Sequence, residues 1–360
     1  MKNKSPIKFK DIAEKAGVSI GTVDRVIHER GRVSEKARKK VLEVMEELEY
    51  HPNLNARVLA SKKPLSIGVL LPSYRKGEYW ELPNLGIREA LDKYADQGYH
   101  IEPVFRTYNS PETFYREGMK LVAEGVDGVI TNPATFRESV HLMRHFFQNN
   151  IPYILIDSDI YGSPSLTFIG KDPVQSGSTV ARLIHQITQH IQGIKIVWII
   201  NVFTKGSQVY SLLGRESGFQ SYFAGKGLSI QYAFQSFDLE DHGSQKEIDQ
   251  ELERLLGTGR PHAIYVTGSR AHRIAAALRK IAPDPKPVLI GHDMIRANLK
   301  GLEDESIDFL IEEESRRQGY LAVESMIRSL IHKEKIEKKQ LMNFLVYTRE
   351  NLPVIPADQG

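Results

Sequence analysis

Residues 9–28 read Phe-Lys-Asp-Ile-Ala-Glu-Lys-Ala-Gly-Val-Ser-Ile-Gly-Thr-Val-Asp-Arg-Val-Ile-His, and this stretch decides the fold of the N-terminal part of the chain. Its apolar spacing predicts one short helix at roughly 10–16 and a second at roughly 20–28. Gly17 can leave the first helix in the left-handed conformation, and the hydroxyl of Ser19 can cap the second. Two helices joined by so short a turn predict a helix-turn-helix.

The second predicted helix turns its first residues outward while its valines face inward. A helix with an exposed start is suited to the major groove of double-stranded DNA. Gly21 has no side chain to read a base, and Ile20 offers only apolar contact to a thymine methyl, so hydrogen-bonded base reading falls on Arg25. The residues of this helix expected at the DNA are Ser19, Ile20, Gly21, Thr22, Arg25 and His28.

A third helix, capped by Ser34, is expected from Glu35 to Leu48 and would close a three-helix core. Its apolar stripe consists of Val41, Leu42, Met45 and Leu48. Pro52 then breaks the chain, and a short hinge helix is expected at 54–61. We therefore expect a DNA-binding head at 1–51 and a hinge helix with its linker at 52–64. The expected DNA contacts of the hinge segment are Asn53, Ala56, Arg57 and Leu59.

Four segments of this region carry a specific pattern. They are Asp-Ile-Ala-Glu-Lys-Ala-Gly-Val-Ser at 11–19, Thr-Val-Asp-Arg-Val at 22–26, Val-Ser-Glu-Lys-Ala-Arg at 33–38 and Tyr-His-Pro-Asn-Leu-Asn-Ala-Arg-Val-Leu-Ala-Ser at 50–61. In this order they resemble the LacI/GalR (lac-repressor-type) family of bacterial transcription regulators. The resemblance implies a homodimer on near-palindromic operator DNA, with Leu59 wedged into a base step of the minor groove. The alternatives are a small helical bundle without a DNA role and, for Leu59, a packing contact with the body.

Charge and composition agree with this division. Residues 1–63 hold 15 Lys and Arg against 9 Asp and Glu, a net of +6, whereas the remaining residues hold 33 against 36, a net of −3. A basic head on a mildly acidic body is expected if only the head meets phosphates. The chain has no cysteine, which excludes disulfides and thiolate catalysis. We expect no signal peptide, because the positively charged N-terminus is not followed by an apolar core. We also expect no membrane association and a cytoplasmic protein, because the apolar runs are far shorter than the ~20 residues of a membrane span.

From residue 65 onward, short apolar runs alternate with longer amphipathic segments, which predicts parallel sheets covered by helices on both faces. The expected strands are 66–72, 101–106, 128–132, 153–157, 167–170, 194–201, 230–237, 263–267, 288–292 and 309–312. The expected helices are 84–94, 113–124, 137–149, 175–189, 215–224, 244–256, 271–281 and 318–330.

Ten strands are many for one sheet, so we expect two lobes that separate near 172–177. The predicted fold class is α/β: a three-helix helix-turn-helix head and a two-lobed, doubly wound parallel-sheet body at 65–360. The first lobe is expected at about 65–172 and 307–328, and the second at about 173–306 and 329–360. This body resembles the periplasmic-binding-protein-like sugar sensor of the same family, in which two lobes close on a ligand.

Ligands of such sheets bind at the carboxyl ends of the strands. The candidate ligand-binding residues near these ends are Tyr74, Trp80, Asn132, Asp157, Arg215, Thr267 and Asp293. The resemblance implies that Arg215 and Asp293 grip ligand hydroxyls, while aromatic rings cover a sugar face. Asp157 and Asp159 could instead cap a turn, and Tyr79 or Trp80 could pack into the lobe. Lys171 and the run Glu312–Glu314 depart from the family pattern. The carboxylates of Glu312–Glu314 either select a ligand that carries hydrogen-bond donors or solvate the end of the strand.

Enzyme motifs fail on their context. Residues 17–21 satisfy G-x-S-x-G, but no strand precedes them and they lie in the helix-turn-helix. His141 and His145 have zinc-ligand spacing, but no third ligand is evident, so a solvated helix face is expected. We expect no catalytic residue, no metal and no cofactor. The predicted function is a ligand-responsive regulator, a repressor, with operator DNA and a sugar-like effector as partners. The alternatives are a nucleobase or phosphorylated metabolite as effector, and a sugar-binding protein or carbohydrate-active enzyme.

Overall fold

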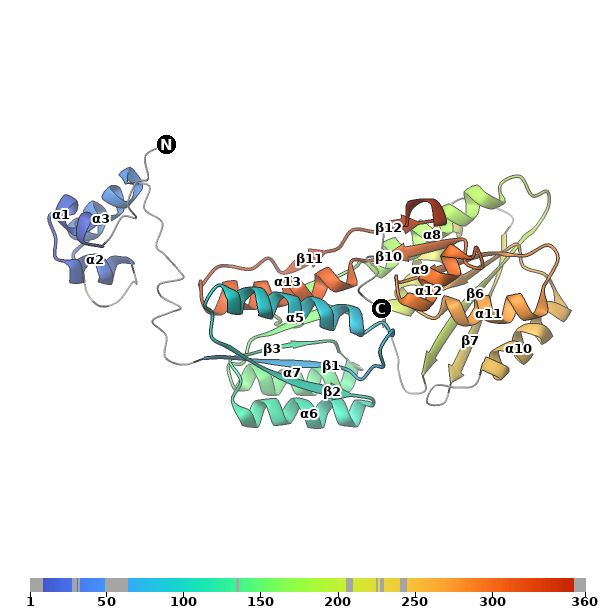
Figure 1. Cartoon of the computed structure of the whole chain (residues 1–360), viewed down its shortest axis with the longest axis horizontal. Coiled ribbons are helices and arrows are strands. Elements are labelled where there is room, and N and C mark those ends of the chain that lie inside the picture. Colours follow the sequence, from blue (N-terminus) through green and yellow to red (C-terminus); the bar gives the residue numbers. More distant parts are fainter. Residues whose placement is uncertain are drawn as a thin grey trace. The chain divides into compact units, whose positions relative to one another are not determined.

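The computed structural model describes residues 9–27, 31, 33–48, 64–133, 136–204, 210–224, 226, 230–239 and 245–352 (Figure 1). The chain forms two compact units, Met1–Lys62 and Lys63–Gly360. The first contains the helix-turn-helix, and the second contains two sheets that are parallel apart from one antiparallel edge strand, Leu345–Tyr347. No helix among the described residues combines the length and apolarity that a membrane span requires.

The head consists, in its described part, of α1 (Phe9–Ala16), α2 (Ile20–Ile27) and α3 (Glu35–Glu47). Gly17 has a φ of 65°, and Ser19 accepts a hydrogen bond from the Thr22 amide at 3.1 Å, so the predicted turn and cap are confirmed. Ser34 likewise accepts from the Ala37 amide. These caps satisfy amides that have no partner inside their helices.

The apolar stripe of α3 needs one correction. Leu42 is 48 % exposed, whereas Val44 is buried beside Val41 in the core of the head. The core residues of the three helices are Ile12, Ala13, Ala16, Val23, Val26, Val41 and Val44. Val41 and Val44 are three residues apart and lie on one helix face, while Leu42 is about 100° further round the helix.

The body contains two six-stranded sheets. The first has the order β11-β5-β4-β3-β1-β2 and the second the order β12-β10-β9-β8-β6-β7. The first sheet uses β1 (Leu65–Pro72), β2 (Ile101–Tyr108), β3 (Gly128–Thr131), β4 (Tyr153–Asp157), β5 (Thr167–Gly170) and β11 (Lys339–Leu341). The second uses β6 (Lys195–Thr204), β7 (Ile230–Leu239), β8 (Ala263–Val266), β9 (Val288–His292), β10 (Phe309–Glu312) and β12 (Leu345–Tyr347). The ten strands predicted from the sequence are present, and β11 and β12 are additions.

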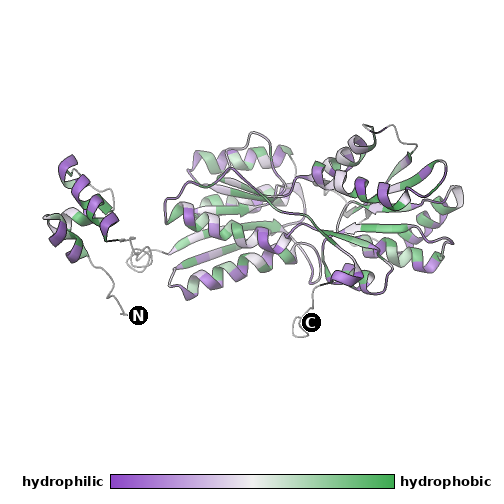
Figure 2. Ribbon diagram, turned by 90° about the horizontal axis from the view of Figure 1, so that it is seen from above, coloured by the Kyte–Doolittle hydropathy of each residue, from purple (hydrophilic) through white to green (hydrophobic). Residues whose placement is uncertain are grey.

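Helices cover both faces of each sheet. The first sheet is covered by α5 (Glu81–Asp96), α6 (Pro111–Glu124), α7 (Phe136–Gln148) and α13 (Ser315–Leu330), with α5 and α13 packed together and α6 beside α7 (Figure 1). The second is covered by α8 (Pro173–Thr188), α9 (Tyr210–Ala224), α10 (Gln245–Thr258), α11 (Ala271–Ile281) and α12 (Arg296–Glu303). Figure 2 shows the strands as largely hydrophobic and the helices as amphipathic, as a three-layered α/β lobe requires.

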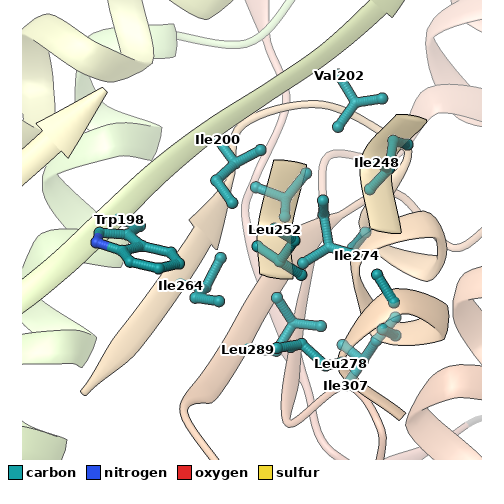
Figure 3. Packing of buried hydrophobic residues seen from close by; sticks show 14 of the residues in the cluster. Trp198, Ile200, Val202, Ile248, Leu252, Ile264, Ile274, Leu278, Leu289 and Ile307 are labelled. Carbon is teal, nitrogen blue, oxygen red and sulfur yellow. The ribbon is translucent and has the colours of Figure 1, made fainter. Parts of the chain in front are cut away.

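Successive residues of one strand enter opposite layers of the second lobe. Val197 and Ile199 pack with α8 and α9, whereas Trp198 and Ile200 pack with α10 and α11. Figure 3 shows this second layer, in which Ile248 and Leu252 of α10 approach the β6 side chains. The alternation follows from the two-residue period of a strand and explains why the whole run is apolar.

The predicted lobe boundaries need a correction. Segment 307–328 was expected in the first lobe, and α13 does pack there, but β10 pairs in parallel with β9 in the second sheet. Segment 329–360 was expected in the second lobe, and β12 does pair there, but β11 pairs with β5 in the first sheet. The chain therefore crosses between the lobes after β5, after β10 and after β11.

Each lobe packs two helices against each other through glycines. A Cβ atom on Gly177 of α8 would lie 1.9 Å from the Arg215 carbonyl oxygen of α9, and one on Gly319 of α13 would lie 2.0 Å from the Pro83 carbonyl oxygen of α5. Only glycine allows this approach of one backbone to another. The contact in the second lobe matters most here, since it fixes the backbone that carries Arg215.

We expect Gly177→Ala to lower the free energy of unfolding by about 1–3 kcal/mol, because its methyl group would force α8 and α9 apart. Urea unfolding measures this change. The control is Gly257→Ala in α10, where an added Cβ meets nothing within 4 Å. That change should be neutral or stabilising, because alanine is the better helix former. Equal effects of the two changes would contradict the close approach of α8 and α9.

Candidate functional site

The two lobes have the same strand order, so their strand ends occupy equivalent positions. In strand order β4 corresponds to β9 and β5 to β10. Asp157, at the end of β4, and Asp293, directly after β9, both adopt a positive φ, of 65° and 70°. Asp157 pairs in register with Gly170, and continuing the register of β9 and β10 brings Asp293 opposite Glu312. The following residues, Lys171 and Glu313, therefore occupy equivalent positions in the two lobes.

These strand ends meet in a buried cluster of charged side chains. Lys171 Nζ lies 2.7 Å from Asp157 Oδ1 and 2.6 Å from Glu313 Oε2. Arg215 Nη2 donates to the same Glu313 oxygen at 2.7 Å, while Ser176 donates to the other at 2.9 Å. All four charged side chains are at most 5 % exposed. The cluster joins residues of both lobes, because Asp157 follows the first sheet and Glu313 the second.

The charge states follow from this geometry. Burial alone would raise the pKa of Glu313, but Arg215 and Lys171 hold that pKa well below its usual range. Burial would likewise lower the pKa of Lys171, yet Asp157 and Glu313 raise it. Both groups are therefore charged at neutral pH, and their hydrogen bonds are the strong, charge-assisted kind.

His292 closes one side of the cluster as a neutral ring. Tyr265 OH lies 2.9 Å from His292 Nε2, and His292 Nδ1 lies 3.4 Å from Glu313 Oε1. Burial, aided by Arg215, lowers the pKa of His292 to about 4. The imidazole therefore adds no positive charge at neutral pH.

Asp293 differs from its counterpart Asp157. Its side chain is 3 % exposed, and its Oδ1 has no hydrogen-bond partner. Burial raises the pKa of Asp293 to about 8, and nearby Glu313 adds to this while Lys171 opposes it. The Arg215 Nε also has no partner. One buried acceptor and one buried donor are thus left for a ligand to satisfy.

Two further predicted residues join this cluster. Asn132 donates to the Ile156 carbonyl oxygen at 3.1 Å, and its amide nitrogen lies 3.5 Å from Asp157 Oδ2. The carbonyl oxygen of Thr267 accepts a hydrogen bond from Arg215. Five of the seven predicted ligand residues therefore lie together: Asn132, Asp157, Arg215, Thr267 and Asp293.

The two aromatic residues that were predicted to bind the ligand, Tyr74 and Trp80, differ from the other five in their surroundings. No described contact links Tyr74 to the cluster; its hydroxyl interacts with Asn84 of α5, and burial raises its pKa. Trp80 packs edge-on against Tyr79, with ring centroids 5.1 Å apart. Tyr79 itself enters the cluster, because its hydroxyl donates to Asp157 Oδ1 at 2.7 Å. Asp159 instead pairs with Lys339, outside the cluster.

The main residue beyond the predicted set is Glu313. Of the run Glu312–Glu314, Glu312 accepts from the Met294 and Ser315 amides and Glu314 pairs with Arg317, while Glu313 is fully buried. The sequence alone does not show which of these three carboxylates turns inward. The structure does, because Glu313 occupies the position in the second lobe that the buried Lys171 occupies in the first.

The head presents the predicted DNA-contacting surface. Ser19, Gly21 and Arg25 are exposed, Thr22 is half-buried, and Ile20 is 50 % exposed although it is apolar. His28, Asn53, Ala56, Arg57 and Leu59 lie outside the described residues. The G-x-S-x-G match at 17–21 lies in the helix-turn-helix. His145 forms a hydrogen bond with Tyr115, and the described residues contain no group of three or more His, Cys, Asp or Glu side chains that could hold a metal ion.

Family models match both parts of the chain. The model for the periplasmic binding protein domain covers residues 67–334, and the model for bacterial regulatory proteins of the lacI family covers residues 8–53. This chain belongs to the lacI family. It combines the family's helix-turn-helix head with a periplasmic-binding-protein-like body, which confirms the resemblance and the fold class predicted from the sequence.

Curated relatives of this chain include two proteins that are named as transcriptional regulators, not as enzymes. The HTH-type transcriptional regulator MalR of Streptococcus pneumoniae is 29 % identical over 48 % of this chain and 51 % of its own length. The HTH-type transcriptional regulator DegA of Bacillus subtilis is 28 % identical over 71 % of each chain. The match to MalR thus spans about half the length of that relative.

Solved structures share the fold of the body. A putative LacI transcriptional regulator from Bacteroides fragilis has a TM-score of 0.73 at 24 % identity, covering 80 % of this chain and 98 % of its own. A solute binding protein from Burkholderia graminis, in complex with D-arabinose, has a TM-score of 0.71 at 20 % identity, covering 82 % and 99 %.

Proposed function

We propose that this chain is a sequence-specific DNA-binding transcription regulator, a repressor, whose operator affinity is set by a small polar effector. The effector, a sugar or sugar derivative, binds where the strand ends of the two lobes meet. The observation that carries this proposal is the buried cluster itself. It joins both lobes through Lys171 and Glu313, yet it leaves Arg215 Nε and Asp293 Oδ1 without partners.

The head favours a regulator over a plain sugar-binding protein, since a sugar carrier has no use for the exposed start of α2. The carboxylates of the cluster disfavour a phosphorylated effector, because two anions would repel each other at this site. We further propose a cytoplasmic homodimer, because one head covers only half of a near-palindromic operator. The domain boundaries at 51 and 64 belong to the same proposal.

The effector can change DNA affinity only through its different affinities for two conformations of the body. Such coupling is typically about 1–3 kcal/mol, or roughly 5–150-fold in affinity. We expect Arg215→Ala to bind operator DNA but to lose the response to effector, because a ligand oxygen then has no guanidinium to accept from. Operator binding in a gel assay, with and without a panel of sugars, measures this. A well-folded variant that responds at wild-type effector concentrations would place the ligand elsewhere.

We expect Arg25→Ala to cost about 1–3 kcal/mol of operator affinity and to relax discrimination at one guanine, because arginine reads guanine with two hydrogen bonds. The control is Lys39→Ala, which removes an exposed cation from α3 rather than from α2. That change should weaken binding to all sequences alike, if at all. Equal loss on operator and random DNA would assign Arg25 to phosphate contact instead.

A further inference from the structure

The equivalence of the two lobes reveals a missing positive charge. In the first lobe, Asp157 receives the ammonium group of Lys171, the residue that follows β5. In the second lobe the residue that follows β10 is Glu313, so Asp293 faces a carboxylate where Asp157 faces a cation. Two buried carboxylates without a cation between them would repel each other, so the ligand-free protein keeps Asp293 protonated at neutral pH, and its Oδ1 has no hydrogen-bond partner.

The charges of the cluster are unequal as well. Its described carboxyl groups are Asp157, Asp293, Glu312 and Glu313, and its cations are Lys171 and Arg215. Glu313 is the carboxylate that pairs with both cations: its Oε2 lies 2.6 Å from Lys171 Nζ and 2.7 Å from Arg215 Nη2. Within the described part of the chain, neither Lys171 nor Arg215 forms an ion pair with Asp293. A buried carboxylate is stable only when it is paired or hydrogen-bonded, so this position is suited to a positively charged partner.

A second open group limits the class of that partner. Arg215 donates through Nη1 to Thr267 and through Nη2 to Glu313, and only its Nε lacks an acceptor. The Nε–H group needs a ligand oxygen, and a hydroxyl is sufficient for it. The ligand therefore needs an acceptor oxygen for Arg215 and a cationic donor for Asp293.

We infer that the effector is an amino sugar or a closely related polyol amine, whose cationic nitrogen binds Asp293 and whose hydroxyl oxygen accepts from Arg215 Nε. This inference rests on the proposed function and specifies the chemistry of the same site. The ligand's ammonium group takes the place beside Asp293 that Lys171 takes beside Asp157. Neutral sugars leave this carboxylate without a cation, and N-acetylated sugars carry no charge to supply one.

Calorimetric titration of the full-length chain tests the inference with matched probes. The probes are D-glucosamine, D-galactosamine and D-mannosamine, each compared with its neutral parent sugar and its N-acetyl derivative at pH 7. Hydrogen bonds to charged groups contribute about 1.5–3 kcal/mol, so we expect at least one amine to bind roughly 10–100-fold more tightly than its neutral partners.

Asp293→Asn should reduce this amine preference to within a few-fold, since the amide carries no charge. The control Asp159→Asn removes a carboxylate that pairs with Lys339 outside the cluster, and it should keep the preference. Tighter binding of a neutral sugar than of its amine would overturn the inference and leave the proposed function intact. Failure of every amine to bind would also overturn it. Failure of the wild-type chain to bind any operator DNA would refute the proposed function, whatever the result with the amines.

Discussion

Replacing Lys171 with methionine is expected to lower the free energy of unfolding by about 3–5 kcal/mol, because it leaves two buried carboxylates without their shared cation. Lys171 is 3 % exposed, and its ammonium group bridges Asp157 and Glu313. Methionine replaces the unbranched lysine side chain up to its ε-carbon, so little packing is lost. Urea unfolding at pH 7 measures the change through the transition midpoint.

The matched control is Lys339→Met. Lys339 also pairs with an aspartate of the first lobe, Asp159, at 2.9 Å, but its side chain is 60 % exposed. A solvated pair contributes less than about 1 kcal/mol, so this change should be small. The double variant Lys171→Met with Glu313→Gln should be less destabilised than the sum of the two single changes, since one removes the charge that the other leaves unpaired. Equal losses for Lys171→Met and Lys339→Met would show that burial does not govern the Lys171 pair.

The sequence was sufficient to locate ten of the strands because most of them form apolar runs that are buried on both faces, although the edge strand β2 is partly exposed. Strand β4, for example, is buried throughout, so its apolar run has sharp ends in the sequence. The short strands β11 and β12 lie at sheet edges and are partly exposed, so they lack such a run. The absence of β11 from the prediction also explains why residues 339–341 were assigned to the second lobe, although they pair with β5 in the first sheet.

The sequence predicted the site residues that end a strand or follow it directly. Asn132, Asp157 and Asp293 satisfy that rule, and the structure brings them into the region of the cluster. Position relative to a strand cannot tell which of several adjacent side chains turns inward. Glu312, Glu313 and Glu314 differ by single residues, and only the pairing of β9 with β10 decides that Glu313 is buried.

Loops are harder to predict than strand ends. The segment after β1 places Tyr79 beside Asp157, while Tyr74 interacts with α5. No periodicity fixes the direction of side chains in such a segment. Composition could identify Tyr74, Tyr79 and Trp80 as candidates for covering a sugar, but only the folded loop distinguishes them.

Replacing Asp293 with asparagine is expected to raise the stability of the ligand-free protein, by an amount that grows with pH. Burial raises the pKa of Asp293 to about 8, with Glu313 and Glu312 adding to the effect and Lys171 and Arg215 opposing it. Between about pH 4 and pH 8 the folded state keeps a proton that the unfolded state releases, so wild-type stability falls as the pH rises. Asparagine carries no charge and avoids this loss. The difference between variant and wild type should therefore be absent near pH 4 and reach at most about 5 kcal/mol near pH 8.

Glu251→Gln provides a control of opposite sign. The hydrogen bonds from Arg254 lower the pKa of Glu251, so its ionised form favours the folded state above about pH 4, and the variant should lose a little stability there. Urea unfolding of both variants across pH 4–8 separates the two signs. A constant difference between Asp293→Asn and wild type over this range would contradict an unpaired buried carboxylate. A growing difference would show that Asp293 costs the ligand-free protein stability, as expected of a residue held unpartnered for a ligand.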